Sequence, residues 1–453
     1  MRGRNKRAVT GLLLGAFVLA GCASTEGVNS LQSDSQVSIE QVARGSNAFA
    51  LDLYREVAKP GENLFFSPAS ISLAMGYAYR GTDGQTAEQL RQVMHFPGGP
   101  EAYLKGAGAL DRTMQISGEG RELRSANAFW VRDDFTLVPG FRADLEREAS
   151  GAFNSADFGN DPEGAREEIN GWVAGKTNDR IEELIPEKVL DTLTASVLVN
   201  AIYWKADWLY PFPAGDTQEE PFFLADGTEI TTNLMNAFED LRGIKRGSVK
   251  LVELPYKGGE VSMVAILPDK PDGLARLESR LSASRLERWL EALDEAEPFN
   301  TVLTLPKMSM DWNADLKSVV EGMGAPLAFS KNANFNRLAT FPQAQLPDWC
   351  GVKITNIIHQ ANIDVDEKGS EAAAATAAVI GAVVISSGRI GPPPPPPFEF
   401  RADHPFMFLL RDNRTGAILF MGRMMDPRQE EGEGPQPYLG PPEGVAPPCP
   451  PKL

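Results

Sequence analysis

Histidine is scarce in this sequence, with only His95, His359 and His404 among 453 residues. The sequence also lacks the G-x-S-x-G, H-E-x-x-H and Walker motifs and any paired C-x-x-C, so few residues remain for a hydrolase, metal or nucleotide site. His95 follows a predicted helix, where a cation near the helix C-terminus accounts for it. We therefore predict a protein that is not an enzyme and that uses no metal and no cofactor.

Cysteine is equally rare, with Cys22, Cys350 and Cys449 only. Cys350 and Cys449 could pair in an oxidising compartment, but two unpaired thiols are equally compatible with the sequence. Cys449 lies in a tail rich in proline, glycine and glutamate, which has little apolar surface to bury. We predict that residues 428–453 form a disordered tail.

A membrane-spanning run is absent from the N-terminus, because the apolar stretch from Ala8 to Ala20 is shorter than the roughly 20 residues that a spanning helix needs. It follows the basic sequence MRGRNKR, which is typical of a signal peptide. The next residues, Leu19-Ala20-Gly21-Cys22, resemble the lipobox of bacterial lipoproteins. This resemblance implies cleavage after residue 21 and a lipid on Cys22.

The residues after the lipobox indicate where the protein is held. Ala23 stands where an Asp would favour retention in the inner membrane of such lipoproteins, so we expect an outer-membrane or cell-surface anchor in the bacterial cell envelope. The domain would then lie in the periplasm or outside. Residues 22–40 are rich in Ser, Gln, Asn, Gly and Thr, which predicts a flexible tether.

Positive charge is in deficit, with 44 Lys and Arg against 61 Asp and Glu, for a formal net charge of −17. Acidity of this size repels anionic polymers, so we expect no nucleic-acid partner. A solvated acidic surface explains the charge, and we expect a monomer.

Helices and strands are both predicted. Ser67 as N-cap, Pro68 at the first position and Gly81 as the stop delimit one helix, and Thr86 with Gln89 would form the capping box of a second. Apolar and β-branched runs bounded by turn residues predict strands over 196–208, 261–268, 301–308 and 404–412. Because the first run is apolar on both faces, it suits a central strand, and the class is α+β.

The stretch EKGSEAAAATAAVIGAVVISSGRIGPPPPPP, residues 367–397, combines an alanine run with six consecutive prolines. Alanine favours helix, and an exposed helix is one possible conformation of the run. As a strand, it would place small uncharged side chains on one face, from Ser370 through Ala372, Ala374 and Thr376, and Glu371 on the other. We expect the small face to enter a protein core while the other face stays in water.

Four segments, in order from about Gln41 to Asp426, resemble the serpin family: NLFFSPASI, LVNAIYWKADW, VDEKGSEAAAATAAVI and FRADHPFMFLL. The resemblance implies a serpin fold over residues 41–427, with about eight or nine helices around three β-sheets and an exposed reactive-centre loop at about 367–399. It also implies inhibition of a serine protease by a suicide mechanism, in which the cleaved loop inserts into the main sheet.

Family resemblance assigns roles to individual residues. The hinge of the loop comprises Glu367, Gly369, Ser370, Ala372, Ala374 and Thr376. A polar cluster beneath the sheet, where strands must part, comprises Ser67, Ser70, Asn200 and His359. Trp208 corresponds to the tryptophan at which insertion begins.

Two bonds compete as the reactive bond. Val383-Val384 keeps the hinge-to-bond length of the family and would suit an elastase-like or subtilisin-like protease; Arg389-Ile390 would suit a trypsin-like one. The loop is longer than that of a compact serpin, and length favours Val383-Val384. The six prolines would form a polyproline II rod that spans the return to the sheet, or a docking motif for a partner.

Three functional classes remain to be compared. The small residues between Ser370 and Ala378 favour an inhibitory serpin, whereas bulky, charged or proline residues there would favour the alternative, a non-inhibitory serpin-fold binding module. An envelope enzyme is the third class, and no motif supports it.

Overall fold

The computed structural model describes residues 36–149, 153–339, 352–370, 395–428 and 431–433. The chain divides into two units, Met1–Ser35 and Gln36–Leu453, and every described residue belongs to the second. The loop beyond Ser370, both candidate reactive bonds, the three cysteines and most of the predicted tether lie outside the described residues.

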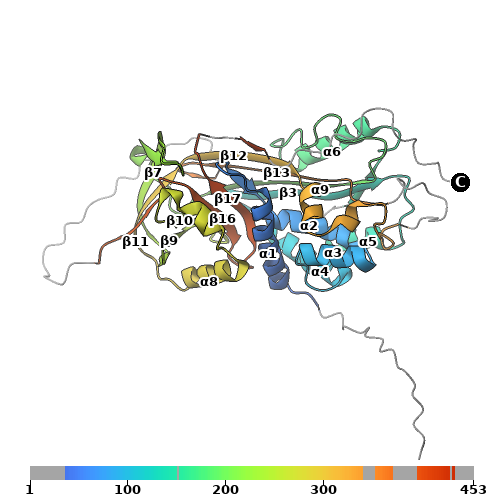
Figure 1. Ribbon diagram of the computed structural model, residues 1–453, viewed down its shortest axis with the longest axis horizontal. Coiled ribbons are helices and arrows are strands. Elements are labelled where there is room, and N and C mark those ends of the chain that lie inside the picture. The colour runs from blue at the N-terminus through green and yellow to red at the C-terminus, as the bar shows by residue number, and fades with distance from the viewer. Residues whose placement is uncertain (1–35, 150–152, 340–351, 371–394, 429–430, 434–453) are drawn as a thin grey trace, which may run out of the picture. The chain divides into compact units, whose positions relative to one another are not determined.

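Nine α-helices occur in the described part of the chain, most of them in its first half (Figure 1). They are α1 (Ile39–Val57), α2 (Pro68–Arg80), α3 (Gly84–Val93), α4 (Pro100–Met114), α5 (Phe141–Glu148), α6 (Pro162–Lys176), α7 (Leu274–Glu278), α8 (Ala283–Asp294) and α9 (Lys317–Gly322). Short 3-10 turns lie at Ala214–Asp216, Pro271–Gly273 and Pro326–Phe329.

The helix limits test the capping predictions. Ser67 caps α2 by accepting from the amide of Ser70, with Pro68 inside and Gly81 at the end, as predicted. The predicted capping box of the second helix is wrong, because α3 begins earlier, after the N-cap Asp83. Thr86 and Gln89 instead accept hydrogen bonds from the backbone amides of Asn334 and Leu327, which no local pattern reveals.

The largest sheet, called the main sheet below, has eight strands in the described residues. Its order is β18 (Glu431–Glu433), β12 (Met308–Asp315), β13 (Asn356–Val365), β14 (Gly369–Ser370), β5 (Ser196–Asp207), β3 (Arg121–Arg132) and β2 (Ser117–Gly118), and β4 (Phe153–Ala156) also pairs with β3. β5 is the predicted central strand, and it is buried along nearly its whole length.

Two smaller sheets complete the domain. The six-stranded sheet has the order β1 (Leu64–Phe66), β17 (Ile418–Met424), β16 (Phe406–Asp412), β10 (Val261–Pro268), β9 (Val249–Pro255) and β8 (Gly243–Arg246). The four-stranded sheet has the order β15 (Phe398–Arg401), β11 (Phe299–Pro306), β7 (Glu229–Leu241) and β6 (Gln218–Phe223).

Helices cover both faces of the main sheet: Figure 1 shows α6 on one side of β3 and β13 and α2 on the other. On the α6 face, Ile169 and Val173 pack with Val197 and Val199 of β5. On the α2 face, Leu198, Ile202 and Trp204 join the large core beneath the sheet. Successive side chains of β5 therefore enter two different cores, which explains its unbroken apolar sequence.

The ends of the domain differ slightly from the predicted limits. α1 begins at Ile39 behind an N-cap at Ser38, so the last residues of the predicted tether are helical. Within the tail predicted to be disordered, Glu431–Glu433 form β18 on the edge of the main sheet.

The candidate site is the seam between β13 and β5

A row of polar side chains crosses the middle of the main sheet. His359 of β13 stands opposite Asn200 of β5 in the parallel ladder, and Asn200 stands opposite Asn127 of β3. Ser67 and Ser70 at the start of α2 lie beneath them and share their hydrogen bonds. We call these five residues the polar row. Insertion of a strand between β13 and β5 would have to separate His359 from Asn200.

The contacts of His359 define its tautomer. The backbone amide of Ser67 donates to His359 Nε2 at 3.2 Å, so this nitrogen carries no proton. Nδ1 therefore carries the proton and donates it to Asn200 Oδ1. Burial lowers the pKa of His359 to about 3, because the charged ring would lose its solvation. At neutral pH the imidazole is therefore a neutral link between two strands.

The remaining contacts close the polar row against α2. Asn200 Nδ2 donates to Ser70 Oγ at 2.5 Å and also to Asn127 Oδ1. Ser70 Oγ donates to the same Asn127 oxygen at 2.6 Å, and Ser67 Oγ donates to the carbonyl of Leu419 at 2.6 Å. The four predicted cluster residues are thus brought together in this structure.

Asn127 is the member of the row that the sequence analysis missed. It lies in β3, far from the other members along the chain, and its side chain is almost fully buried. A single amide inside the apolar run SANAFWV is a weak signal, because it does not reveal its partners. Only the register of β3 with β5 places it beside Asn200.

The seam is closed along most of its length and open at one end. Residues Asn356–Asn362 of β13 pair directly with Val197–Tyr203 of β5. Beyond that ladder, β14 lies between the two strands, with Ser370 opposite Val365 of β13 and Ala206 of β5. The first hinge residues therefore already occupy the open end of the seam.

Ser370 and Trp208 meet at this open end. The Ser370 side chain is fully buried and shares a hydrogen bond of 2.7 Å with the hydroxyl of Tyr256. The Tyr256 ring stacks on Trp208, with ring centroids 4.3 Å apart. Trp208 in turn donates from Nε1 to the carbonyl of Asp366 at 3.0 Å. The tryptophan predicted to mark the start of insertion therefore lies directly against the hinge.

Gly369 and Glu367 fix the chain as it enters the seam. A Cβ on Gly369 would stand 2.0 Å from the carbonyl oxygen of Ala206, so only glycine fits there. Glu367 pairs with Lys307 at 2.8 Å and accepts from Thr217 at 2.7 Å. Partial burial opposes its ionisation, but the hydrogen bonds from Lys307 and Thr217 hold the pKa of Glu367 below its ordinary value.

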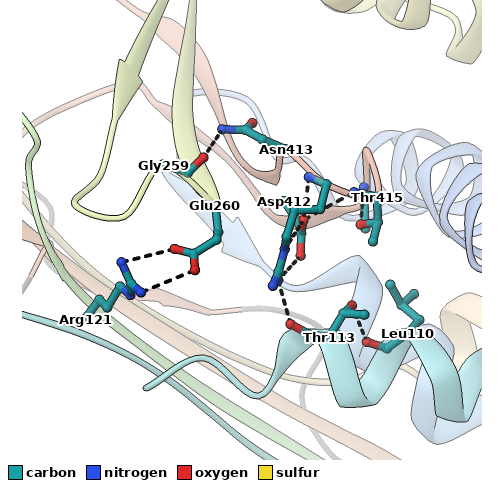
Figure 2. A network of polar contacts seen from close by, with 10 residues as sticks. Leu110, Thr113, Arg121, Gly259, Glu260, Asp412, Asn413 and Thr415 are labelled. Carbon is teal, nitrogen blue, oxygen red and sulfur yellow. Dashed lines mark hydrogen bonds and ion pairs between the residues drawn. The ribbon is translucent and has the colours of Figure 1, made fainter. Parts of the chain in front are cut away.

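A second set of contacts joins the start of β3 to two neighbouring hairpins near the open end (Figure 2). Arg121 at the start of β3 pairs with Glu260 at 3.2 Å, and the amide of Asn413 donates to the Glu260 carbonyl at 2.8 Å. Figure 2 also shows the side chain of Asn413 reaching the carbonyl of Gly259, at 3.1 Å. These contacts tie the end of the main sheet to two hairpins of the six-stranded sheet.

The same set extends to α4. Arg414 donates to Asp412 at 2.6 Å and to the carbonyl of Thr113, in the last turn of α4, at 2.6 Å. Asp412 is fully buried, and its carboxylate forms an ion pair with the Arg414 guanidinium. The hairpins beside the open end are anchored at both sheet and helix.

Other kinds of site are not found in the part of the chain that the structure describes. No three His, Cys, Asp or Glu side chains of these residues could hold a metal ion together. Among the described helices, none has the length and apolar character to cross a membrane.

The domain has three sheets, and β14 already fills one end of the seam. A comparison with known protein families agrees with this architecture. The family model described as serpin (serine protease inhibitor) matches residues 44–427. The chain belongs to the serpin family. The predicted serpin fold, with nine helices and three sheets in the described residues, is confirmed.

Similar proteins span almost the same length. A serpin-like protein of Methanosarcina acetivorans is 34% identical over 400 residues, covering 87% of this chain and 88% of that protein. Leukocyte elastase inhibitor A of Rattus norvegicus is 32% identical over 403 residues, covering 86% and 100%. The solved structure of human thyroxine-binding globulin complexed with thyroxine is 25% identical, with a TM-score of 0.73 and coverage of 86% and 100%.

Proposed function

We propose that this serpin inhibits a serine protease by inserting its cleaved loop into the seam between β13 and β5. The observation that carries the proposal is the position of β14, whose two residues already pair with both strands. Inhibition would follow when cleavage frees the rest of the loop to continue along the seam before the acyl-enzyme is hydrolysed.

The register of β14 predicts where each loop residue would go. Gly369 stands opposite Asp207 and Ser370 opposite Ala206, antiparallel to β5. Extended without a bulge, the same register brings Thr376 opposite Asn200, and the pairing of Ser370 with Val365 brings it opposite His359. The inserted Thr376 would thus take the place between the two residues that now hold the seam closed.

Successive residues of the inserted loop would face the two cores on either side of the main sheet. This differs from the expectation that one face of the inserted loop stays in water. Residues 372, 374 and 376 would face the large core, as Ser370 does. On the opposite face, residues 375, 377 and 379 would come opposite Ala201, Val199 and Val197, which are buried against α6. Over residues 374–379 both faces therefore require small or apolar side chains, whereas residues 371 and 373, opposite Lys205 and Tyr203, fall outside the cluster on the α6 face.

The target is proposed to be an elastase-like or subtilisin-like protease that cleaves Val383-Val384. A small apolar side chain before the bond supports this choice, as does the similarity to a leukocyte elastase inhibitor. Arg389-Ile390, with a trypsin-like target, is the alternative. The distance from Ser370 to Val383 is 14 residues, or about 45 Å of extended strand, which would carry the protease along most of the sheet.

Incubation with elastase, subtilisin and trypsin tests the proposal. We expect an SDS-resistant complex with at least one of them, and mass spectrometry of the released C-terminal peptide identifies the bond. Cleavage by all three without any complex would contradict inhibition and favour the binding-module alternative, a role like that of thyroxine-binding globulin, which was solved with thyroxine bound.

We further propose that the protein is tethered to a bacterial cell envelope through a lipid on Cys22. The lipobox-like sequence and the polar residues after it support this location. The Cys22→Ser variant should leave the membrane fraction, and intact mass spectrometry of the wild type should show the acyl groups. Unchanged fractionation together with an unmodified mass would contradict the anchor.

A further inference from the structure

The outer edge of the main sheet is covered along three residues by a C-terminal segment of the chain. β12 pairs with β13 along one edge, from Met308 opposite Val365 to Asp315 opposite Ile358. On its other edge, Asp311–Asn313 pair in parallel with β18, Glu431–Glu433. Without β18, β12 would be the edge strand of the main sheet, and its outward backbone groups would be open.

An open edge here would be a site for pairing with another chain. Edge strands present unpaired N–H and C=O groups, which bind other strands unless they are short, charged, bulged or covered. β12 has eight residues, and Met308, Met310, Trp312 and Ala314 are buried beneath it. Because these side chains anchor it to the core, β12 cannot turn its edge away.

Trp312 gives the middle of this edge a link to the seam. It stands opposite Gly432 in β18, and its ring lies 6.2 Å from that of Phe66 and 5.9 Å from that of His359. The middle of the edge is therefore fixed to the core next to the polar row.

The C-terminal segment has the composition of an edge cover. Two glutamates flank Gly432, and Pro435 and Pro437 follow shortly after. Charges and prolines discourage the addition of a further strand, because proline has no amide to donate. A three-residue strand of this kind can satisfy part of the β12 edge while offering a poor edge of its own.

We propose that Glu431–Glu433 guards the edge of β12 and so prevents the main sheets of two copies of this chain from pairing. The segment is the resident occupant of the edge, and a second copy is the occupant that it excludes. This role is independent of protease inhibition, because the edge of β12 is not the seam into which the loop would insert.

The test is the double variant Gly432→Pro with Glu433→Pro in the full-length protein. Successive amides of a strand point to opposite sides, so replacing both removes the one that faces β12, whichever it is. The matched control is Gly440→Pro with Glu443→Pro, which changes the same residue types further along the tail. Both variants are held at a mildly elevated temperature, and the loss of monomer is followed by size-exclusion chromatography.

We expect the strand variant to lose monomer on the order of tenfold faster than wild type, because the edge cover rests on only a few ladder hydrogen bonds. The control should behave as wild type. Hydrogen exchange should become faster at the outward amides of Asp311–Asn313 in the strand variant, while β5 keeps its protection. Equal loss of monomer in the two variants would overturn the guarding role, and unchanged exchange at Asp311–Asn313 would overturn the occupancy itself.

Discussion

At the scale of single residues, the seam depends on two buried side chains whose polar atoms are hydrogen-bonded. His359 links β13 to β5 as a neutral ring, and Ser370 fills the open end with a small hydroxyl. Each is suited to its place by size and charge, so a change of either property should have a large effect.

Protonation of His359 should weaken the fold in acid. The unfolded histidine binds a proton below its ordinary pKa of 6.5, whereas the folded one resists protonation until about 3. Its contribution to the free energy of unfolding is therefore complete above pH 6.5 and falls as the pH drops, by about 2 kcal/mol at pH 5. Urea unfolding of wild type and His359→Gln at pH 7.5 and 5 measures it.

The glutamine variant is the control, because it keeps a donor and an acceptor but does not titrate. The carboxylates change the unfolding free energy of both proteins equally between the two pH values, so their effect cancels in the comparison. If both proteins lost the same stability between the two pH values, His359 would not be the neutral link described here.

The Ser370→Arg substitution should convert the inhibitor into a substrate. An arginine cannot replace the buried hydroxyl beside Tyr256 without leaving a charge in the core, at a cost of several kcal/mol. It would push β14 out of the seam, and each 1.4 kcal/mol added to the insertion barrier slows insertion about tenfold. The ratio of SDS-resistant complex to cleaved inhibitor measures the effect.

Glu371→Gln serves as the control, since residue 371 would point to the opposite face and should leave the complex yield nearly unchanged. A normal complex yield from Ser370→Arg would mean that the loop does not insert in the register of β14.

At the scale of elements, the main sheet is closed by a parallel ladder and a row of side chains that the inserted strand would have to replace. The ladder between Asn356–Asn362 and Val197–Tyr203 would be lost on the proposed insertion, and two new ladders would form. The hydrogen bonds of the polar row would have to be replaced after insertion, because a buried amide or imidazole without a partner costs about 1–3 kcal/mol.

Thr376 is expected to restore the row after cleavage. In the Thr376→Val variant the shape is kept but the hydroxyl is lost, so the cleaved protein should be less stable than cleaved wild type by about 1–3 kcal/mol. The measurement is the difference in unfolding free energy between cleaved and uncleaved protein.

Ser386→Ala removes a hydroxyl on the other side of the proposed bond and should leave this difference as in wild type. The same difference in Thr376→Val and wild type would show that Thr376 does not reach the polar row.

At the scale of the whole molecule, the uncleaved protein holds an incompletely filled sheet. In the proposed mechanism, cleavage would let the loop enter the seam, where β13 and β5 now pair directly, and would release stored free energy. The gain would come from backbone hydrogen bonds along an inserted strand, each worth roughly 0.5 to 1.5 kcal/mol net.

Cleavage of the loop should therefore raise the melting temperature, on the order of 10 °C or more. Differential scanning calorimetry before and after a single cut between Val379 and Arg389 gives the comparison. Equal melting temperatures would identify a non-inhibitory serpin, since no strand would have been added to the sheet.

The sequence by itself determined the local features of this protein. The apolar run of β5, the caps of α2 and the small residues of the hinge are each encoded in neighbouring residues, and the four serpin-like segments follow in order. Such features follow from period, size and backbone preference, which short stretches of chain carry on their own.

Only the tertiary structure decided which distant residues meet. The pairing of Asn127 with Asn200, the ion pair of Glu367 with Lys307, the entry of Ser370 into the seam and the docking of β18 on β12 all join segments far apart in the chain. The capping prediction for Thr86 and Gln89 is wrong for the same reason: their side chains are used by loops some 240 residues away. A local pattern shows what a side chain can bind, but the packing of the sheets determines what lies beside it.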